Sequence, residues 1–316
     1  MSRSARLFLT CLMLALSLIP ARAQDSIDIV LQLAPRPMPT AVMIESGTRL
    51  ELYFSSLKQG GLGLLRLAGD GIEDPRLDFL GRVRPFFQVE DDAWYALLIV
   101  DMNASPGLRQ LTVTADRGLE EISFTRDIRV DSGRFILQEF NLPADRAYLV
   151  DPAIEAAEFA RLDEITRESG PEPLWDAGGF GLPLESETTS PFGAFRELND
   201  GVKTRHTGWD QRAPNATPVH AMAAGRVAFA APLEIRGDVV VIDHGVGVYT
   251  LYAHLSGTNV TQGQAVDAGQ IIGLSGNSGR SSGPHLHWEL IVEGLWLNGL
   301  DIVALWLPSW RDPFRS

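Results

Sequence analysis

Short apolar runs separated by turn residues dominate the first half of the chain. The clearest lie over residues 42–44, 50–54, 94–100, 110–114 and 122–130, and Ser105-Pro106-Gly107 marks a turn between two of them. Short strands with turns about every ten residues are typical of a β-sandwich. We therefore predict a sandwich-like β domain over residues 24–145. This region contains no histidine and no recognisable catalytic constellation.

A different periodicity follows, over residues 146–187. Asp151-Pro152 predicts a helix start, with an acidic N-cap and proline in the first turn. Apolar residues then recur at helical spacing, from Ile154 to Ile165, until Gly170-Pro171 ends the segment. We interpret this stretch as a helical connector and linker. The pattern leaves open whether the helix docks one domain on the other or is an exposed linker.

Strand patterns return in the last part of the chain, and we predict a second, antiparallel β domain over residues 188–316. A loop rich in Gly, Pro, Ser and Thr over residues 178–198 leads into it, and the clearest strands lie at 225–229, 238–243, 248–254 and 285–292. The apolar run 295–307 is too short to span a bilayer and predicts a buried strand. No phosphate-binding or dinucleotide-binding fingerprint is present. The chain is thus predicted to be mostly β, with one connecting helix.

The first 23 residues have the pattern of a secretory signal peptide. Arg3 and Arg6 precede an apolar stretch over residues 7–19, and Ala21-Arg22-Ala23 matches an A-x-A cleavage site. The alternative, an uncleaved anchor, is disfavoured by that site and by the polar residues after it. The one cysteine, Cys11, lies in this segment, so the mature chain needs no disulfide.

Charge excludes one class of partner. Removal of the signal peptide takes away three arginines and no acidic residue, which moves the formal net charge from −13 to −16. Such an acidic protein is not expected to bind nucleic acid or anionic lipid non-specifically. After cleavage we also expect no membrane span.

The candidate chemistry lies in the histidines. All six fall between residues 206 and 287. His285 and His287 stand two apart on a predicted strand, so both side chains point to one face. Two imidazoles aimed into one space are costly to bury without a ligand, and a metal ion is the usual one.

A second pair upstream completes a metal-binding set. His206 and Asp210 add an imidazole and a carboxylate, which gives the three protein ligands of a catalytic zinc site together with one of His285 and His287. The remaining histidine of the pair and His254 are then candidates for general base, general acid or oxyanion stabiliser. Spacing alone does not decide which of His285 and His287 is the ligand. For His220 and His244 a packing or surface role is favoured.

These motifs resemble the lysostaphin-type (LytM-domain) zinc metallopeptidases, which cut peptidoglycan peptides. The resemblance covers roughly residues 188–292 and rests on the H-x-x-x-D of His206 and Asp210, the Y-A-H-L ending at Leu255, and the G-P-H-L-H ending at His287. The segments S-P-F-G, T-P-V-H-A and G-N-S-G-R-S-S-G agree with the same pattern. One departure is Asn215-Ala216, which stands where the family usually has a glycine.

The resemblance implies roles for individual residues. It implies that His206, Asp210 and His287 bind one zinc ion and that His254 and His285 are the catalytic residues. The expected function is a secreted endopeptidase that hydrolyses peptidoglycan cross-links, with stem or cross-link peptides as substrate. The expected location is the periplasm of a Gram-negative bacterium, and an envelope partner could bind through the N-terminal domain.

Two other functions compete with this one. A non-catalytic LytM-domain protein that binds cell wall or activates a murein amidase is the main alternative, although relatives of that kind often lack ligands and this chain lacks none. A biotinyl- or lipoyl-type carrier is excluded because no lysine follows Lys203.

Overall fold

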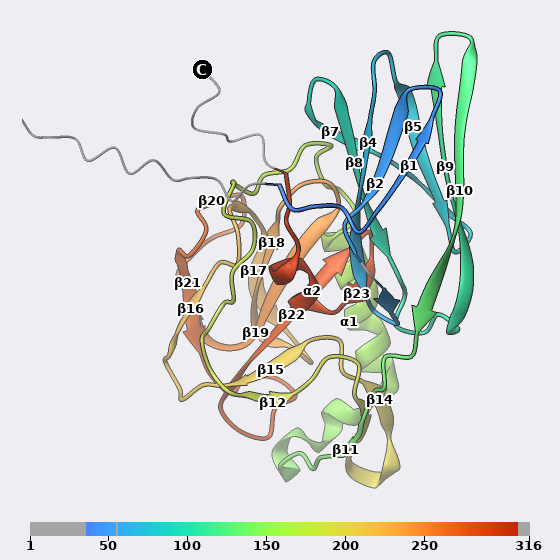
Figure 1. Ribbon diagram of the computed structural model, residues 1–316. Helices are drawn as coiled ribbons and strands as arrows, with labels where there is room; N and C mark the ends of the chain where they lie inside the picture. The colour runs from blue at the N-terminus through green and yellow to red at the C-terminus, as the bar shows by residue number, and fades with distance from the viewer. Residues whose placement is uncertain (1–35, 55, 309–316) are drawn as a thin grey trace, which may run out of the picture. The chain divides into compact units, whose positions relative to one another are not determined.

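The N-terminal half of the described chain is built from two five-stranded sheets (Figure 1). The computed structural model describes residues 36–54 and 56–308; the predicted signal peptide and Cys11 lie outside them. The first sheet has the order β1 (Ala41–Glu45), β2 (Thr48–Leu52), β4 (Leu62–Ala68), β8 (Ala93–Ile99), β7 (Phe87–Glu90). The second has the order β3 (Leu57–Lys58), β10 (Glu120–Asp131), β9 (Gly107–Arg117), β5 (Glu73–Phe79), β6 (Arg82–Pro85). The prediction of a mostly β N-terminal region is confirmed.

Strand β4, the middle strand of the first sheet, is buried on both faces. Leu65 of β4 lies in the core between the first and second sheets, and Val113 and Phe124 of the second sheet belong to the same core. Its neighbour Leu64 points the other way, into a core that also contains Val219 and Trp288 from the C-terminal half. Strand β4 therefore lacks the alternation of apolar and polar residues that marks a half-exposed strand, which is why the sequence pattern missed it.

The connecting segment of the structure, residues 137–187, begins before the predicted connector and contains a short strand and two helices. Strand β11 (Leu137–Glu139) pairs in parallel with β13 (Phe195–Glu197), and β14 (Lys203–Arg205) completes that small sheet. The 3₁₀ helix η1 (Ala144–Val150) leads into α1 (Pro152–Ile165). The Asp151 side chain caps α1 by accepting a hydrogen bond of 2.8 Å from the Ala153 N–H, as the sequence predicts. The helix ends at Ile165, earlier than Gly170-Pro171 suggested.

Helix α1 packs on the C-terminal half. Leu162 is fully buried in a cluster with Val239, Tyr249 and Ile291. Glu158, one turn earlier, is also buried, although a carboxylate in that position breaks the expected apolar stripe.

A large, mainly antiparallel sheet forms the C-terminal half. Its order is β12 (Thr188–Ser190), β15 (Trp209–Arg212), β22 (His285–Val292), β19 (Val248–Thr258), β18 (Gly237–Asp243), β17 (Gly225–Leu233), β20 (Ala265–Val266), and β16 (Pro218–His220), β21 (Ile271–Ser275) and β23 (Leu295–Leu297) attach to it. The prediction of one buried strand over 295–307 was wrong: β23 ends at Leu297, and the next residue, Asn298, caps helix α2 (Gly299–Ala304) by accepting a hydrogen bond from the Leu300 N–H. Among the described residues, no helix is long and apolar enough to cross a membrane.

Candidate metal centre

Three neighbouring strands bring the predicted residues together. Strand β22 lies between β15 and β19, and the antiparallel register sets His287 opposite Asp210 on one side and opposite Ala253 on the other. His206 precedes β15 by three residues, and His254 follows Ala253 on β19. The five candidates thus meet at one end of three adjacent strands.

His206, Asp210 and His287 point one donor atom each at a common position. The His206 Nε2 atom lies 3.0 Å from Asp210 Oδ1 and 3.0 Å from His287 Nδ1, and the third side of the triangle, Asp210 Oδ1 to His287 Nδ1, is 2.7 Å. Ligands at about 2.0–2.2 Å from a tetrahedral zinc ion lie roughly 3.3 Å apart. Two nitrogens and one oxygen at this spacing fit zinc and leave a fourth position open.

Each of the two histidines is oriented through its other ring nitrogen. His206 Nδ1 donates to the Pro191 carbonyl oxygen at 2.7 Å, and His287 Nε2 donates to Glu289 Oε1 at 2.7 Å. These bonds leave a lone pair on the nitrogens that face the common position. Histidines that bind metal almost always have such a partner, so the donor set supports a metal centre.

The aspartate of this set is held as a carboxylate. Burial alone would raise the pKa of Asp210, but His206 and the Arg196 guanidinium bring it well below its ordinary value. Arg196 donates to Asp210 Oδ2 and to the Ser190 hydroxyl, so it occupies the oxygen that does not face the histidines. An ionised Asp210 is the form that can bind a cation.

The two histidines of this triangle, His206 and His287, differ in their affinity for protons. Burial lowers the pKa of His206 to about 4. Burial acts in the same direction on His287, but hydrogen bonds to the carboxylates of Asp210 and Glu289 outweigh it, so the pKa of His287 is raised. In the metal-free chain a proton therefore binds His287 before it binds His206.

His254 and His285 flank the same position. Their ring centroids lie 4.8 Å apart, and the His254 ring lies 5.7 Å from that of His287. His254 Nδ1 bonds to the Ser278 carbonyl oxygen and His285 Nδ1 to the Gly283 carbonyl oxygen, each at 2.8 Å. Because each Nδ1 atom has a backbone partner, the Nε2 atoms of both rings can take part in proton transfer. The Nε2 atom of His285 lies 3.6 Å from Asp210 Oδ1.

The backbone at His254 is unusual. Its φ of +57° lies in the left-handed region, which non-glycine residues adopt only at a cost. The N–H of His254 donates to the Arg236 carbonyl oxygen at 2.8 Å, which holds this conformation. The turn also breaks the alternation along β19, so Tyr252 does not share the face of His254. Its hydroxyl instead accepts a hydrogen bond from the Met222 N–H at 2.8 Å and lies 2.8 Å from the Thr250 hydroxyl, within the core.

A cavity of about 330 Å³ opens beside these residues. Its lining includes Asp210, His254 and His285, the arginines Arg196, Arg212 and Arg280, and the connector residues Gln138, Glu139 and Phe140. The Arg280 guanidinium bonds to Glu155 of α1 at 3.0 Å. One wall of the cavity thus comes from the connecting segment.

The remaining histidines lie elsewhere. His244 is fully buried, with Nδ1 2.8 Å from the Ala224 carbonyl oxygen and Nε2 2.7 Å from the Thr250 hydroxyl. Burial lowers its pKa to about 4. His220 is half-buried and faces the Pro183 carbonyl oxygen at 3.3 Å. These contacts are those of packing histidines.

Sequence reasoning missed the residues that bond to the candidate ligands, above all Glu289. It lies two residues after His287 on the same strand, so it shares its face, and this spacing could have revealed it. Arg196 and Arg236 carry no comparable signal, because neither stands at a strand spacing from a candidate ligand: Arg196 lies on β13, and Arg236 lies in the turn between β17 and β18.

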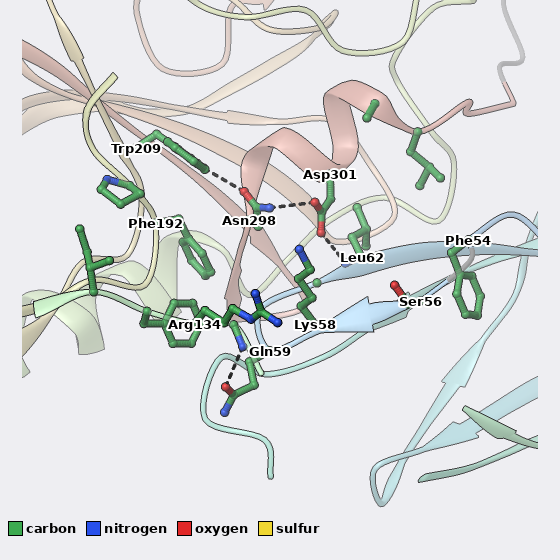
Figure 2. A pocket seen from close by; sticks show the side chains of 17 residues that line it. Phe54, Ser56, Lys58, Gln59, Leu62, Arg134, Phe192, Trp209, Asn298 and Asp301 are labelled. Carbon is green, nitrogen blue, oxygen red and sulfur yellow. Dashed lines mark hydrogen bonds between the residues drawn. The ribbon is translucent and has the colours of Figure 1, made fainter. Parts of the chain in front are cut away.

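A second cavity, of about 520 Å³, lies away from the histidines (Figure 2). Along its wall, Trp209 Nε1 donates to Asn298 Oδ1 at 2.9 Å, and Asn298 Nδ2 donates to Asp301 Oδ1 at 2.8 Å. Asp301 Oδ2 in turn accepts the Leu62 N–H at 3.1 Å. This chain of bonds links β4 of the sandwich to the residue before Asp210.

Comparisons with known proteins agree with this geometry. The model of Peptidase family M23 matches residues 204–299. The DD-carboxypeptidase/endopeptidase Mpg of Neisseria meningitidis serogroup B is 41% identical over 131 residues, which are 41% of this chain and 30% of that protein. The peptidoglycan DD-endopeptidase ShyA of Vibrio cholerae is 47% identical over 95 residues, 30% of this chain and 22% of that protein. The chain therefore spans less than a third of the length of these relatives.

One solved structure resembles a larger share of the chain. A Pseudomonas aeruginosa protein assigned to peptidase M23 has a TM-score of 0.57 and 24% sequence identity, and the match covers 79% of this chain and 96% of that one. At this identity the likeness concerns the fold.

Proposed function

We propose, on the premise that residues 204–299 of this chain belong to Peptidase family M23, that the protein is a zinc metalloendopeptidase that hydrolyses peptide cross-links of bacterial peptidoglycan. The observation that carries the proposal is the triangle of His206, Asp210 and His287 donor atoms beside two further histidines. The names of the Neisseria and Vibrio relatives support peptidoglycan peptides as the substrate class.

In this proposal His206 Nε2, Asp210 Oδ1 and His287 Nδ1 hold the ion. When bound, zinc supplies Lewis acidity, which polarises a peptide carbonyl and lowers the pKa of a coordinated water. Glu289 and the Pro191 carbonyl oxygen keep the two imidazoles in the required tautomers. Arg196 keeps Asp210 ionised and in place.

His254 and His285 are assigned the proton transfers. Because each Nδ1 is bonded to a backbone carbonyl oxygen, each Nε2 carries a lone pair that can accept a proton from the attacking water and pass it to the leaving amine. Burial and the neighbouring imidazoles of His285 and His287 hold the pKa of His254 well below its ordinary value, so His254 is neutral before reaction. The cavity beside them would bind the peptide, with Arg212 and Arg280 at its wall.

Location and partners belong to the same proposal. The signal-like pattern of residues 1–23 and the relatives that act on peptidoglycan support export across the inner membrane, with the periplasm of a Gram-negative bacterium as the working compartment. The sandwich over the N-terminal half is available to an envelope partner, and the connector contributes to the substrate cavity.

The test is digestion of purified, chemically defined peptidoglycan, with mass spectrometry of the released fragments. Wild-type protein should release peptides that identify the cleaved bond, and Asp210→Ala and His287→Ala should release none. A purified protein that binds no zinc yet stimulates a separate amidase would favour the non-catalytic alternative and overturn the proposal.

A further inference from the structure

Helix α1 lies outside the region that matches Peptidase family M23, yet it reaches the candidate metal centre. Glu158 on this helix is 5% exposed, and its carboxylate faces the turn between β17 and β18. It accepts hydrogen bonds from the Ile235 N–H at 2.6 Å and the Arg236 N–H at 3.2 Å. It also pairs with Arg236 Nη1 at 2.8 Å. A buried carboxylate with three donors has a defined position.

The Arg236 guanidinium links Glu158 to Glu289. Its Nε and Nη2 atoms donate to Glu289 Oε1 at 3.0 and 2.8 Å. The same oxygen accepts from the Thr207 hydroxyl at 2.6 Å and from His287 Nε2 at 2.7 Å. Glu158, Arg236 and Glu289 thus form a buried row of alternating charges that ends on a ligand histidine.

The other oxygen of Glu289 is also held with the help of α1. Trp296 Nε1 donates to Glu289 Oε2 at 2.7 Å. The Phe159 ring of α1 packs edge-on against Trp296, with centroids 4.9 Å apart, and the Arg236 guanidinium carbon lies 5.3 Å from the centre of the same Phe159 ring. Adjacent residues of one helix therefore support the partners of both Glu289 oxygens.

The charges explain why Glu158 is needed. With Glu158 in place, Arg236 is balanced by two buried carboxylates, and Glu289 can direct an oxygen to His287. Without Glu158, the Ile235 and Arg236 N–H groups lose their buried acceptor, and the guanidinium has Glu289 as its one remaining carboxylate partner among the described residues. The turn that carries Arg236, whose carbonyl oxygen also accepts the His254 N–H, is then free to shift.

We propose that Glu158 is a positioning residue of the metal centre: through Arg236 and Glu289 it fixes His287 as a zinc ligand, so the connecting helix is part of the catalytic unit. This inference rests on the proposed zinc site. It predicts that zinc affinity depends on a residue 48 positions before the first ligand, on a segment outside the family match.

The test compares zinc affinity in full-length variants by equilibrium competition with a chromophoric chelator at neutral pH. Glu158→Gln keeps the size of the side chain and removes its charge. Glu164→Gln makes the same change on the exposed side of the same helix, where Glu164 pairs with Arg161. Loss of a group that orients a metal ligand typically weakens binding by roughly 10–100-fold. We expect about tenfold weaker binding for Glu158→Gln and no change for Glu164→Gln.

Stability is measured in parallel, because Glu158 is buried. If Glu158→Gln lowers the melting temperature equally with and without zinc and leaves the zinc dissociation constant unchanged, its role is structural only and the inference is overturned. If that variant does not fold, Phe159→Leu takes its place: it removes the ring contacts to Trp296 and Arg236 without changing charge. It should weaken zinc binding, and wild-type affinity in a folded Phe159→Leu protein would overturn the inference.

These readouts separate the inference from the proposed function. A wild-type protein that binds zinc and shows the Glu158 dependence but cuts no peptidoglycan would contradict the proposed activity alone. A wild-type protein that cuts peptidoglycan while Glu158→Gln binds zinc normally would contradict this inference alone.

Discussion

Asp210 stands directly opposite His287 in the antiparallel ladder of β15 and β22, and the two side chains bring Oδ1 and Nδ1 to 2.7 Å. Residues paired across a ladder have side chains on the same face of the sheet. Two of the three proposed ligands are therefore positioned by backbone pairing, and only His206 depends on a loop.

The spacing of these strands provides a first prediction, at Gly208. A Cβ atom there would lie 2.1 Å from the Trp288 carbonyl oxygen and 2.9 Å from His287 Cε1. Gly208→Ala should push β15 away from β22, lower the free energy of unfolding by about 1–3 kcal/mol and weaken zinc binding. Chemical denaturation and chelator competition measure the two effects. Gly257→Ala is the control, because a Cβ at Gly257 meets no atom within 4 Å; equal behaviour of the two variants would contradict this account.

The proposed division of labour between ligands and catalytic residues gives a second prediction. His285→Ala should retain one zinc ion per chain and lose roughly 10²–10⁴-fold in peptide release, because general acid–base catalysis typically contributes that much. His287→Ala should lose both zinc and activity. Zinc content measured by mass spectrometry, together with fragment release, distinguishes the two. If His285→Ala were isolated without zinc, His285 would have to be reassigned as a ligand.

The sequence indicated that these side chains would lie together because its signals are local. Strand alternation placed His285 and His287 on one face, and the spacing of His206 and Asp210 brought both to one end of β15. Alternation does not extend to His254 and Tyr252, which stand two apart on β19, because the backbone of His254 is left-handed and the Tyr252 hydroxyl bonds to the Met222 N–H in the core. A positive φ of 64° at Ala216 also explains why a glycine is usual at Asn215-Ala216 in the resembling family.

What the sequence could not predict depends on long-range packing. Strand β4 is apolar on both faces because it lies between two cores, so its pattern carries no period of two. Glu158 sits where α1 should be apolar, and only the buried guanidinium of Arg236 explains it. Neither the burial of β4 on both faces nor the pairing of Glu158 with Arg236 produces a pattern in the adjacent residues of the sequence.

A third prediction concerns acid. Because the pKa of His287 is raised and that of His206 is lowered to about 4, one proton should compete with zinc as the pH falls through the His287 pKa. Zinc affinity should not change with pH well above the pKa of His287, where this histidine is neutral. Below that pKa, zinc affinity should fall by up to about tenfold for each unit that the pH decreases. Chelator competition between pH 8 and pH 5 measures this. A slope of two protons in the upper part of that range would show that His206 titrates with His287.

The fully buried His244 gives a fourth prediction, on stability. Its pKa is about 4 in the folded chain, because burial disfavours the charged ring, and about 6.5 when unfolded. The unfolded chain therefore binds the proton more readily between these values. The stabilising contribution of neutral His244 is complete above pH 6.5 and declines as the pH falls towards 4. Denaturant titrations at pH 7.5 and 5 should show a smaller loss of stability for His244→Gln than for wild type; equal losses would contradict this assignment.

The most direct test of the central claim is anomalous scattering at the zinc absorption edge from a crystal of the zinc-loaded full chain. The account predicts one peak about 2.0–2.2 Å from each of His206 Nε2, Asp210 Oδ1 and His287 Nδ1. A peak on a different set of side chains, or none at this position in protein that hydrolyses peptidoglycan, would contradict it.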